Sequence, residues 1–307
     1  MSNILIYGET TKLAKELLSA ARVIGGQVYG VSINNDEQAQ ALGACGANML
    51  RINNSELFLA DTAAVACVLQ QAAENIDADT VLLTSNRSGK ELAGRVAQLL
   101  QGGCLTDVNK LNINNGRVEC TRNALGGATV AVQVIKTDRK IIAISPKSFD
   151  TAEEGAAGTV TDWKLELDSS YIKVLEVKEK AVESVNIESV ELLIAIGQGV
   201  DDQSQLALVQ DIAQAIGGEV ACSKPVATDK KWLSEERIIG ISGKICKPTV
   251  AILLGISGQV QFSVGIRDAK TIISVNNDEN ALICDMSDYV LIAALQEAIP
   301  ELKNAVA

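Results

Sequence analysis

The segment Gly-Ile-Ser-Gly-Gln-Val-Gln-Phe, residues 255–262, follows an apolar run and leads into a predicted helix. Backbone amides of Ser257 and Gly258 at the start of that helix would attract a phosphate through unpaired N–H donors and the helix dipole. The alternative is that the two glycines only permit a tight turn between a strand and a helix. A single turn of this kind does not decide between the two.

Other segments also place glycines or small polar residues directly after predicted strands. They are Gly197–Gly199, Ser223–Pro225, Gly240–Gly243 and Asn276. Because the carboxyl ends of parallel strands meet at one edge of a sheet, we expect these segments to converge with residues 255–258, which favours a ligand site. The chain has neither the complete Gly-x-Gly-x-x-Gly fingerprint nor a Gly-Lys-Ser/Thr phosphate loop. The residues alone therefore indicate an α/β protein with a candidate nucleotide site.

The chain contains no histidine, which excludes Ser-His-Asp triads, Cys-His dyads and His-ligated metals. Its cysteines are widely spaced and form no Cys-x-x-Cys pair, so we expect reduced thiols and neither a zinc nor an iron–sulfur site. Acid–base chemistry would fall to carboxylates, lysine or tyrosine. The cysteines are Cys45, Cys67, Cys104, Cys120, Cys222, Cys246 and Cys284.

The net charge is −11 and no basic stripe occurs, which disfavours binding to nucleic acid. We expect a cytoplasmic protein, because the N-terminus lacks the pattern of a signal peptide and no apolar run reaches about 18 residues. Hydrophobic residues make up 47% of the chain but aromatic residues only 3%. Such aliphatic cores are common where parallel strands lie between layers of helices.

The first half of the chain alternates predicted strands with predicted helices, which indicates a parallel sheet with right-handed crossovers. The strands are 3–8, 27–33 and 79–85, and the helices are 10–25, 36–46 and 89–102. Asn115–Gly116 predicts a hairpin turn, and residues 140–145 predict another strand. The polar stretch 147–190 is interpreted as an edge strand, within 162–168, followed by a connector.

The second half restarts the alternation. The predicted strands are 191–199, 219–223, 237–242, 250–255 and 271–276, and the predicted helices are 203–218, one starting at 259, and 290–305. We therefore predict two doubly wound nucleotide-binding-type α/β domains, each with a mostly parallel sheet: residues 1–188 including the connector, and residues 189–307. Trp163 and Trp232 are predicted to pack in the cores.

Residues 219–292 resemble the FAD-binding domain of the electron transfer flavoprotein α subunit. The resemblance lies in Ser-Lys-Pro at 223–225, Gly-Ile-Ser-Gly at 240–243, the segment 255–262, Asn-Asn-Asp at 276–278 and Ser-Asp-Tyr at 287–289. Residues 84–100 and the following Leu-Thr-Asp-Val at 105–108 resemble the N-terminal part of the same family. The resemblance therefore covers nearly the whole chain.

This resemblance implies an electron carrier rather than an enzyme that converts a substrate. The cofactor would be FAD on the C-terminal domain, and the partner would be a β subunit in a heterodimer. Electrons would pass from dehydrogenases of the acyl-CoA type, as in fatty acid β-oxidation, to a quinone- or ferredoxin-linked acceptor. Two alternatives stay open: a non-redox homologue acting as an AMP- or dinucleotide-binding or scaffold subunit, and a homodimer when the partner is absent. An enzyme of adenine-nucleotide chemistry is disfavoured by the missing histidine and phosphate-loop lysine.

The resemblance also assigns roles to individual residues. Ser257, Gly258, Gln259, Val260 and Gln261 would lie along the pyrophosphate and ribityl chain. Asn276 would face the adenosine, and Asp288 is a candidate for the ribose. The residues implied around the flavin, either approaching it or completing its turns, are Gln198, Ser223, Lys224, Ile239, Gly240, Ile241, Ser242, Phe262, Ala294 and Leu295.

Several of these positions depart from the family pattern. Gln198 and Lys224 replace arginines, Phe262 replaces a histidine and Ala294 an aspartate, and Gly240-Ile241-Ser242 replaces Gly-Gln-Thr. Lysine keeps the charge of arginine but loses its forked geometry. A lost charge-assisted hydrogen bond is worth about 1.5–3 kcal/mol. We therefore predict that the anionic semiquinone of bound FAD is less stable than in typical relatives.

Overall fold

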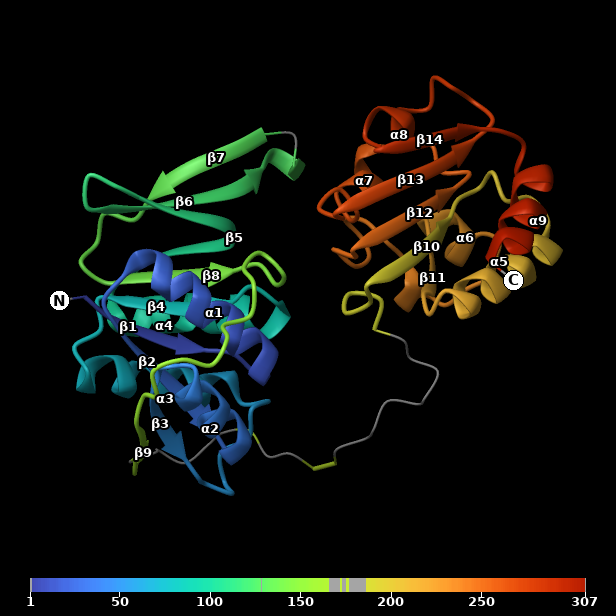
Figure 1. Cartoon of the computed structure of the whole chain (residues 1–307). Helices are drawn as coiled ribbons and strands as arrows, with labels where there is room; N and C mark the ends of the chain where they lie inside the picture. Colours follow the sequence, from blue (N-terminus) through green and yellow to red (C-terminus); the bar gives the residue numbers. More distant parts are fainter. Residues whose placement is uncertain (1, 128, 166–171, 173–174, 177–185, 307) are drawn as a thin grey trace. The chain divides into compact units, whose positions relative to one another are not determined.

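The computed structural model describes residues 2–127, 129–165, 172, 175–176 and 186–306. The chain divides into two compact units, residues 1–177 (unit 1) and residues 178–307 (unit 2). Each unit has its own sheet with helices packed on it (Figure 1). The predicted α/β class with mostly parallel sheets is confirmed.

Unit 1 is built on a nine-stranded sheet with the order β7-β6-β5-β8-β4-β1-β2-β3-β9. Neighbouring strands are parallel except in the pairs β5–β6 and β6–β7. The predicted hairpin joins β5 to β6, and its residues Asn115 and Gly116 both have the positive φ that such a tight turn requires. The strands are β1 Asn3–Tyr7, β2 Gln27–Ile33, β3 Asn48–Ile52, β4 Thr80–Thr84, β5 Gly103–Asn114, β6 Arg117–Ala124, β7 Thr129–Val134, β8 Lys140–Ile144 and β9 Val160–Asp162.

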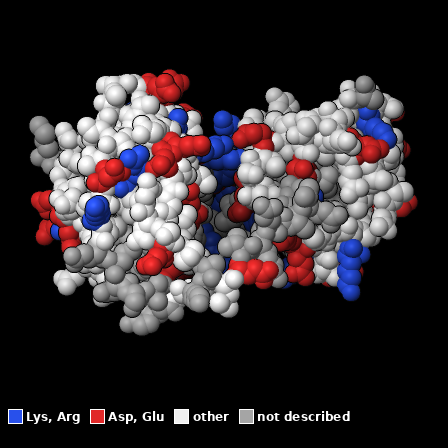
Figure 2. Space-filling model, turned by 90° about the horizontal axis from the view of Figure 1, so that it is seen from below, with Lys and Arg blue, Asp and Glu red and all other residues white. Residues whose placement is uncertain are grey.

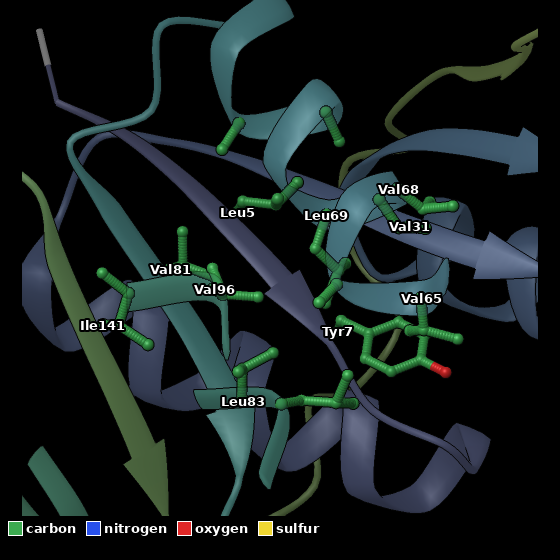
Figure 3. Close-up of a cluster of buried hydrophobic side chains, with 14 of the residues drawn as sticks. Leu5, Tyr7, Val31, Val65, Val68, Leu69, Val81, Leu83, Val96 and Ile141 are labelled. Atoms are coloured by element: carbon green, nitrogen blue, oxygen red, sulfur yellow. The ribbon is translucent and has the colours of Figure 1, made fainter. Parts of the chain in front are cut away.

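Helices cover both faces of this sheet. α1 (Thr11–Ile24) and α2 (Asp36–Ala44) pack on one face, and α3 (Thr62–Asn75) and α4 (Arg87–Leu100) on the other. Figure 3 shows the second core, where Leu5 and Val81 of the sheet meet Leu69 and Val96 of the helices. Neither β3 nor α3 was predicted from the sequence. Trp163 packs against this core, as predicted.

Unit 2 contains a five-stranded sheet with the order β11-β10-β12-β13-β14, and all its pairs are parallel. The chain order reverses between β10 and β12, which is the switch point where doubly wound sheets bind ligands. The strands are β10 Leu192–Ile196, β11 Glu219–Cys222, β12 Val250–Leu254, β13 Thr271–Asn276 and β14 Tyr289–Ile292. The helices are α5 Gln203–Ala215, α6 Lys224–Thr228, α7 Val260–Ser263, α8 Leu282–Asp285 and α9 Leu295–Val306.

Two sequence-based assignments in unit 2 were wrong. The predicted strand 237–242 is a loop with isolated bridges, because Gly240 has φ +128° and turns the chain. The predicted helix 290–305 begins only at Leu295, since Tyr289–Ile292 is the edge strand β14 paired with β13. That stretch is aromatic, β-branched and aliphatic, which favours a strand. Ala294 consequently precedes α9.

The predicted edge strand of the first half occurs slightly earlier than expected. β9 lies at the edge of the sheet and pairs with β3. Its bounds, Val160–Asp162, overlap the predicted stretch 162–168 at one residue only. Residues 166–168 of that stretch are outside the described residues.

The switch point of unit 2 depends on glycines that approach one another closely. A Cβ at Gly197 would lie 2.2 Å from the carbonyl oxygen of Gly255. A Cβ at Gly255 would lie 2.8 Å from the Cα of Gly199 and 2.7 Å from Cδ1 of Leu295, and Gly255 also has φ +62°. These glycines are therefore required by the close contact between two backbone turns, a structural role beyond the tight turn that the sequence suggested.

We predict that Gly255→Ala destabilises unit 2 by about 3 kcal/mol or more, because a strained φ is combined with overpacking against backbone. Gly217→Ala is the matched control, since Gly217 has φ +68° but no atom within 4 Å of its would-be Cβ. That variant should lose only about 1–2 kcal/mol. Urea unfolding of the full chain, followed by Trp232 fluorescence in a Trp163→Phe background, measures both values. Equal losses would contradict the close-approach explanation.

Candidate functional site

A cleft of about 500 Å³ lies at the carboxyl edge of the unit 2 sheet, within the size range of cofactor sites. Its walls come from the segments that follow β10, β11, β12 and β13, and from the loop after residue 237. The expected convergence of these segments on one rim is what the structure shows. The lining residues are Gly197–Gly199, Ser223–Pro225, Ile239, Ser242, Gly255–Ser257, Gln259, Gln261, Phe262, Asn276, Asp278 and Ala281.

Most residues singled out from the sequence meet in this cleft. They are Gln198, Ser223, Lys224, Ile239, Ser242, Ser257, Gln259, Gln261, Phe262 and Asn276. Asp278 and Ala281 also line the cleft, although the residue pattern predicts a role for neither. Both residues could have been predicted, because the loop after β13 continues along the carboxyl edge of the sheet beyond Asn276.

The remaining singled-out residues lie beside the cleft or away from it. Gly240, Ile241, Gly258 and Val260 belong to its loops without lining it. Ala294 precedes α9 and Leu295 is its first residue, which is buried against Gly255. The structure places Asp288 at the opposite edge, where it precedes β14 and its Oδ2 accepts a hydrogen bond from the amide of Ile272 at 2.8 Å.

Backbone N–H groups, rather than a helix dipole, are what this cleft offers to an anion. α7 has only 4 residues, so the dipole expected from the sequence is too short to contribute much. Within the described residues, however, the successive amides of 257–261 donate no hydrogen bond. Unpaired N–H groups of this kind are the donors that phosphate oxygens accept.

The carbonyl oxygens of the same turns are already bound by the protein. Asn276 Nδ2 donates to the carbonyl of Ile256 at 2.9 Å, and Ser263 Oγ donates to that of Gly258 at 2.9 Å. The carbonyl of Gln261 accepts from the amide of Ile241 at 2.9 Å. The turns therefore offer a ligand mainly N–H groups, which favours an anion over a cation.

The side-chain amide of Asn276 is used in hydrogen bonds within the protein and is not free to donate to a ligand. Its side chain is buried, and besides holding Ile256 it accepts a hydrogen bond from the amide of Asp278 at 3.1 Å. One amide group thus joins the β12 turn to the β13 turn. Both turns line the cleft, so Asn276 sets their separation.

The opposite wall is apolar. Phe262 is 7% exposed and packs in a buried cluster with Ile239, Ile256 and Ile266. Its ring presents no hydrogen-bonding group to the cleft. Lys224 and Asp278, both exposed, are the charged residues among those that line the cleft.

The described cleft residues do not form a site for covalent or metal catalysis. Cys222 ends β11 nearby, but burial raises the pKa of its thiol to about 12, so it stays protonated at neutral pH. No group of three or more acidic or cysteine side chains suited to a metal occurs among the described residues. The arrangement can bind and orient a ligand, and it offers no activated nucleophile.

Unit 1 has a different switch point, between β1 and β4. There Glu9 follows β1, and its carboxylate accepts hydrogen bonds from Asn86 Nδ2 at 3.0 Å and from Ser88 Oγ. A negative charge held in this place disfavours a phosphate. Lys90 is paired with Asp107 at 2.7 Å. The candidate anion site is therefore in unit 2.

Acidic side chains occur on both units over the face that Figure 2 shows, in keeping with the net charge of −11. No helix among the described residues has the length and apolar character needed to cross a bilayer.

Comparison with known proteins gives matches to both halves of the chain. A family model described as an electron transfer flavoprotein domain matches residues 7–168, and one described as an electron transfer flavoprotein FAD-binding domain matches residues 186–267. Protein FixB of Escherichia coli O157:H7 is 28% identical over 312 residues, covering 100% of this chain and 98% of the relative. Protein FixB of Shigella flexneri gives the same figures, and that of Escherichia coli strain SMS-3-5 / SECEC is 29% identical with the same coverage.

We predict that Asn276→Leu lowers the free energy of unfolding of unit 2 by about 2 kcal/mol or more, because it leaves a buried carbonyl and an amide without partners. Asn277→Leu is the control, since Asn277 is exposed and directly follows Asn276. Urea unfolding followed by Trp232 fluorescence measures both. Equal stability of the two variants would contradict the role of Asn276 in holding the two turns together.

Proposed function

The chain belongs to the electron transfer flavoprotein family, as an α-type subunit that binds FAD and carries electrons, and we propose that its FAD binds in the cleft of unit 2. Residues 189–307 would form the FAD-binding domain. The observation that carries this proposal is the row of unpaired amides at 257–261 facing no protein acceptor.

The donor set suits FAD in chemical terms. A pyrophosphate needs N–H donors, which the 257–261 amides supply. The ribityl and ring oxygens need polar partners, and Ser223, Ser242 and Gln259 line the same cleft. The ring system itself needs apolar surface, which Phe262 and Ile239 provide.

Each part of the cleft then has a proposed role. The turn 257–261 binds the pyrophosphate and ribityl chain, and Asn276 holds that turn on the adenosine side. Ser223, Lys224, Ser242 and Gln198 surround the flavin. Asp288 lies at the edge of the sheet opposite the cleft, so we do not assign it a role at the ribose.

FAD, when bound, supplies transfer of one or two electrons through its isoalloxazine ring. The chain contributes binding and environment. Phe262 excludes water from one wall, Lys224 provides a positive charge at the rim, and the buried side chain of Asn276 keeps the turns in register. The absence of an activated nucleophile among the described cleft residues accords with an electron carrier.

Chains of this type normally pair with a β subunit, and we propose such a heterodimer here. The electron donors would be dehydrogenases of the acyl-CoA type, and the acceptor would be quinone- or ferredoxin-linked. These finer assignments are supported by the sequence resemblance of residues 219–292 alone.

Co-expression with a β subunit tests the cofactor site. We expect a yellow heterodimer that releases FAD on heating, and weaker FAD retention when Gly258 is replaced by Ala, since its Cβ would lie 2.1 Å from the amide nitrogen of Ile283 and displace the turn. A colourless heterodimer would overturn the proposal and would favour a non-redox nucleotide-binding or scaffold subunit.

We predict that Phe262→His raises the midpoint potential of bound FAD by about 30 mV, the equivalent of a tenfold preference for the two-electron reduced form. The reason is that an imidazole N–H can donate to the negatively charged reduced ring, whereas a phenyl ring cannot. Phe262→Leu is the control, because it keeps the wall apolar. Potentiometric titration measures both, and a potential that is unchanged or lowered in Phe262→His would contradict the prediction.

A further inference from the structure

Lys230 does not line the cleft, but it binds the turn after β10, which forms one of the cleft walls. Its ammonium donates to the carbonyl oxygen of Gln198 at 3.3 Å and to that of Val200. Both carbonyls belong to the turn after β10, and Gly197–Gly199 of this turn line the cleft. Lys230 is separated from this turn by about thirty residues of sequence.

The lysine is itself anchored at two further points. Its backbone amide donates to the carbonyl of Pro225, a cleft residue, at 3.1 Å. Its ammonium sits 4.3 Å from the ring centroid of Trp232, a cation–π distance. Trp232 packs against the buried core of unit 2. Lys230 therefore links the segment after β11 to the turn after β10.

The glycines of this turn pack against Gly255 but contribute no side chains of their own, so the contact with Lys230 adds a side-chain anchor to the turn. One backbone hydrogen bond lies within the turn, from Val200 to Gly197 at 3.2 Å, and two join the turn to the end of β12, from Gly197 to Leu254 at 2.8 Å and from Gly199 to Gly255 at 3.1 Å. By binding the carbonyl of Gln198, Lys230 fixes the orientation of the 198–199 peptide plane. The amide of Gly199 is then directed towards Gly255.

The charge of Lys230 is not neutralised by a carboxylate within the described part of the chain. Its contacts there are two carbonyl oxygens and an aromatic ring. The neighbouring Asp229 instead accepts a hydrogen bond from Thr228 at 2.8 Å. An unpaired positive charge in partly buried surroundings acts over a longer range than an exposed ion pair.

We propose that Lys230 is a positioning residue that orders the turn at 197–200 and places a positive charge behind it, which strengthens FAD binding and favours the reduced flavin. This inference rests on the proposed FAD site and adds a residue that does not line it. It makes Lys230 a second source of positive charge on the cleft, in addition to Lys224.

The test compares Lys230→Met with Lys231→Met in the heterodimer. The control removes the same charge one residue away, from an exposed side chain. We expect Lys230→Met to raise the dissociation constant of FAD about tenfold, or about 1.4 kcal/mol. If the reduced form is weakened tenfold more than the oxidised form, the midpoint potential falls by about 30 mV. Lys231→Met should change neither value.

A second measurement does not need FAD. In the FAD-free protein, hydrogen exchange of the amides of Gly199 and Val200 should accelerate in Lys230→Met and stay at the wild-type rate in Lys231→Met. Lys230→Arg should restore the potential, because it keeps the charge.

The outcomes distinguish a failure of the role proposed for Lys230 from a failure of the proposed FAD site. Equal effects of Lys230→Met and Lys231→Met, or faster exchange without any change in potential or affinity, would overturn the assignment of Lys230 while leaving the FAD site intact. Wild-type protein that binds no FAD would overturn the proposed site itself, and the role of Lys230 with it.

Discussion

In the cleft of unit 2, the protein binds the backbone carbonyl oxygens of the turns but leaves backbone amides unpaired. Protein donors bind the carbonyl oxygens of the turns: Asn276 binds Ile256, Ser263 binds Gly258 and Lys230 binds Gln198. The amides of 257–261 are left without acceptors in the described chain. Since each peptide plane carries its N–H opposite its C=O, fixing the carbonyl also fixes where the amide is presented. The protein thereby prepares a set of donors before any ligand arrives, which reduces the ordering cost of binding.

This preparation requires the turns to lie closer together than side chains permit. Gly197, Gly199 and Gly255 touch backbone to backbone at the switch point, and Gly240 does the same against Gln261. The glycines that first suggested a phosphate turn thus have a structural function. They bring the donor-bearing segments to one rim, and the anion affinity follows from the amides that the packing leaves unpaired. The structural reading of the glycines and the phosphate-binding reading are therefore compatible, because the close packing creates the unpaired amides.

The sequence predicted this rim well because strand ends in a parallel sheet share an edge, so Ser223, Ser257 and Asn276 could be placed together without coordinates. It failed where contacts are non-local or where no breaker separates two elements. Tyr289–Ile292 runs into α9 without a glycine or proline between them, so a strand was taken for part of a helix. Asp288 was a candidate for the ribose, but it precedes β14 and binds the amide of Ile272, which puts it at the opposite edge. The role of Lys230 could not be predicted locally, because the carbonyl oxygens that its ammonium binds lie about thirty residues away in the sequence.

The substitutions at the cleft also have to be weighed together. A phenyl ring at 262 removes one hydrogen bond, worth about 1.5–3 kcal/mol when charge-assisted. Two opposite unit charges about 8 Å apart attract each other by about 2 kcal/mol at an effective dielectric constant of about 20, which is of the same size. The apolar wall made by Phe262 and Ile239 also lowers the local dielectric constant, so any nearby charge acts more strongly. Loss of a hydrogen-bonding group at 262 and retention of lysine charge around the β10 turn therefore oppose each other. With FAD in the proposed site, the reduced cofactor would then be stabilised by lysine charge at longer range, more than by a direct hydrogen bond from position 262.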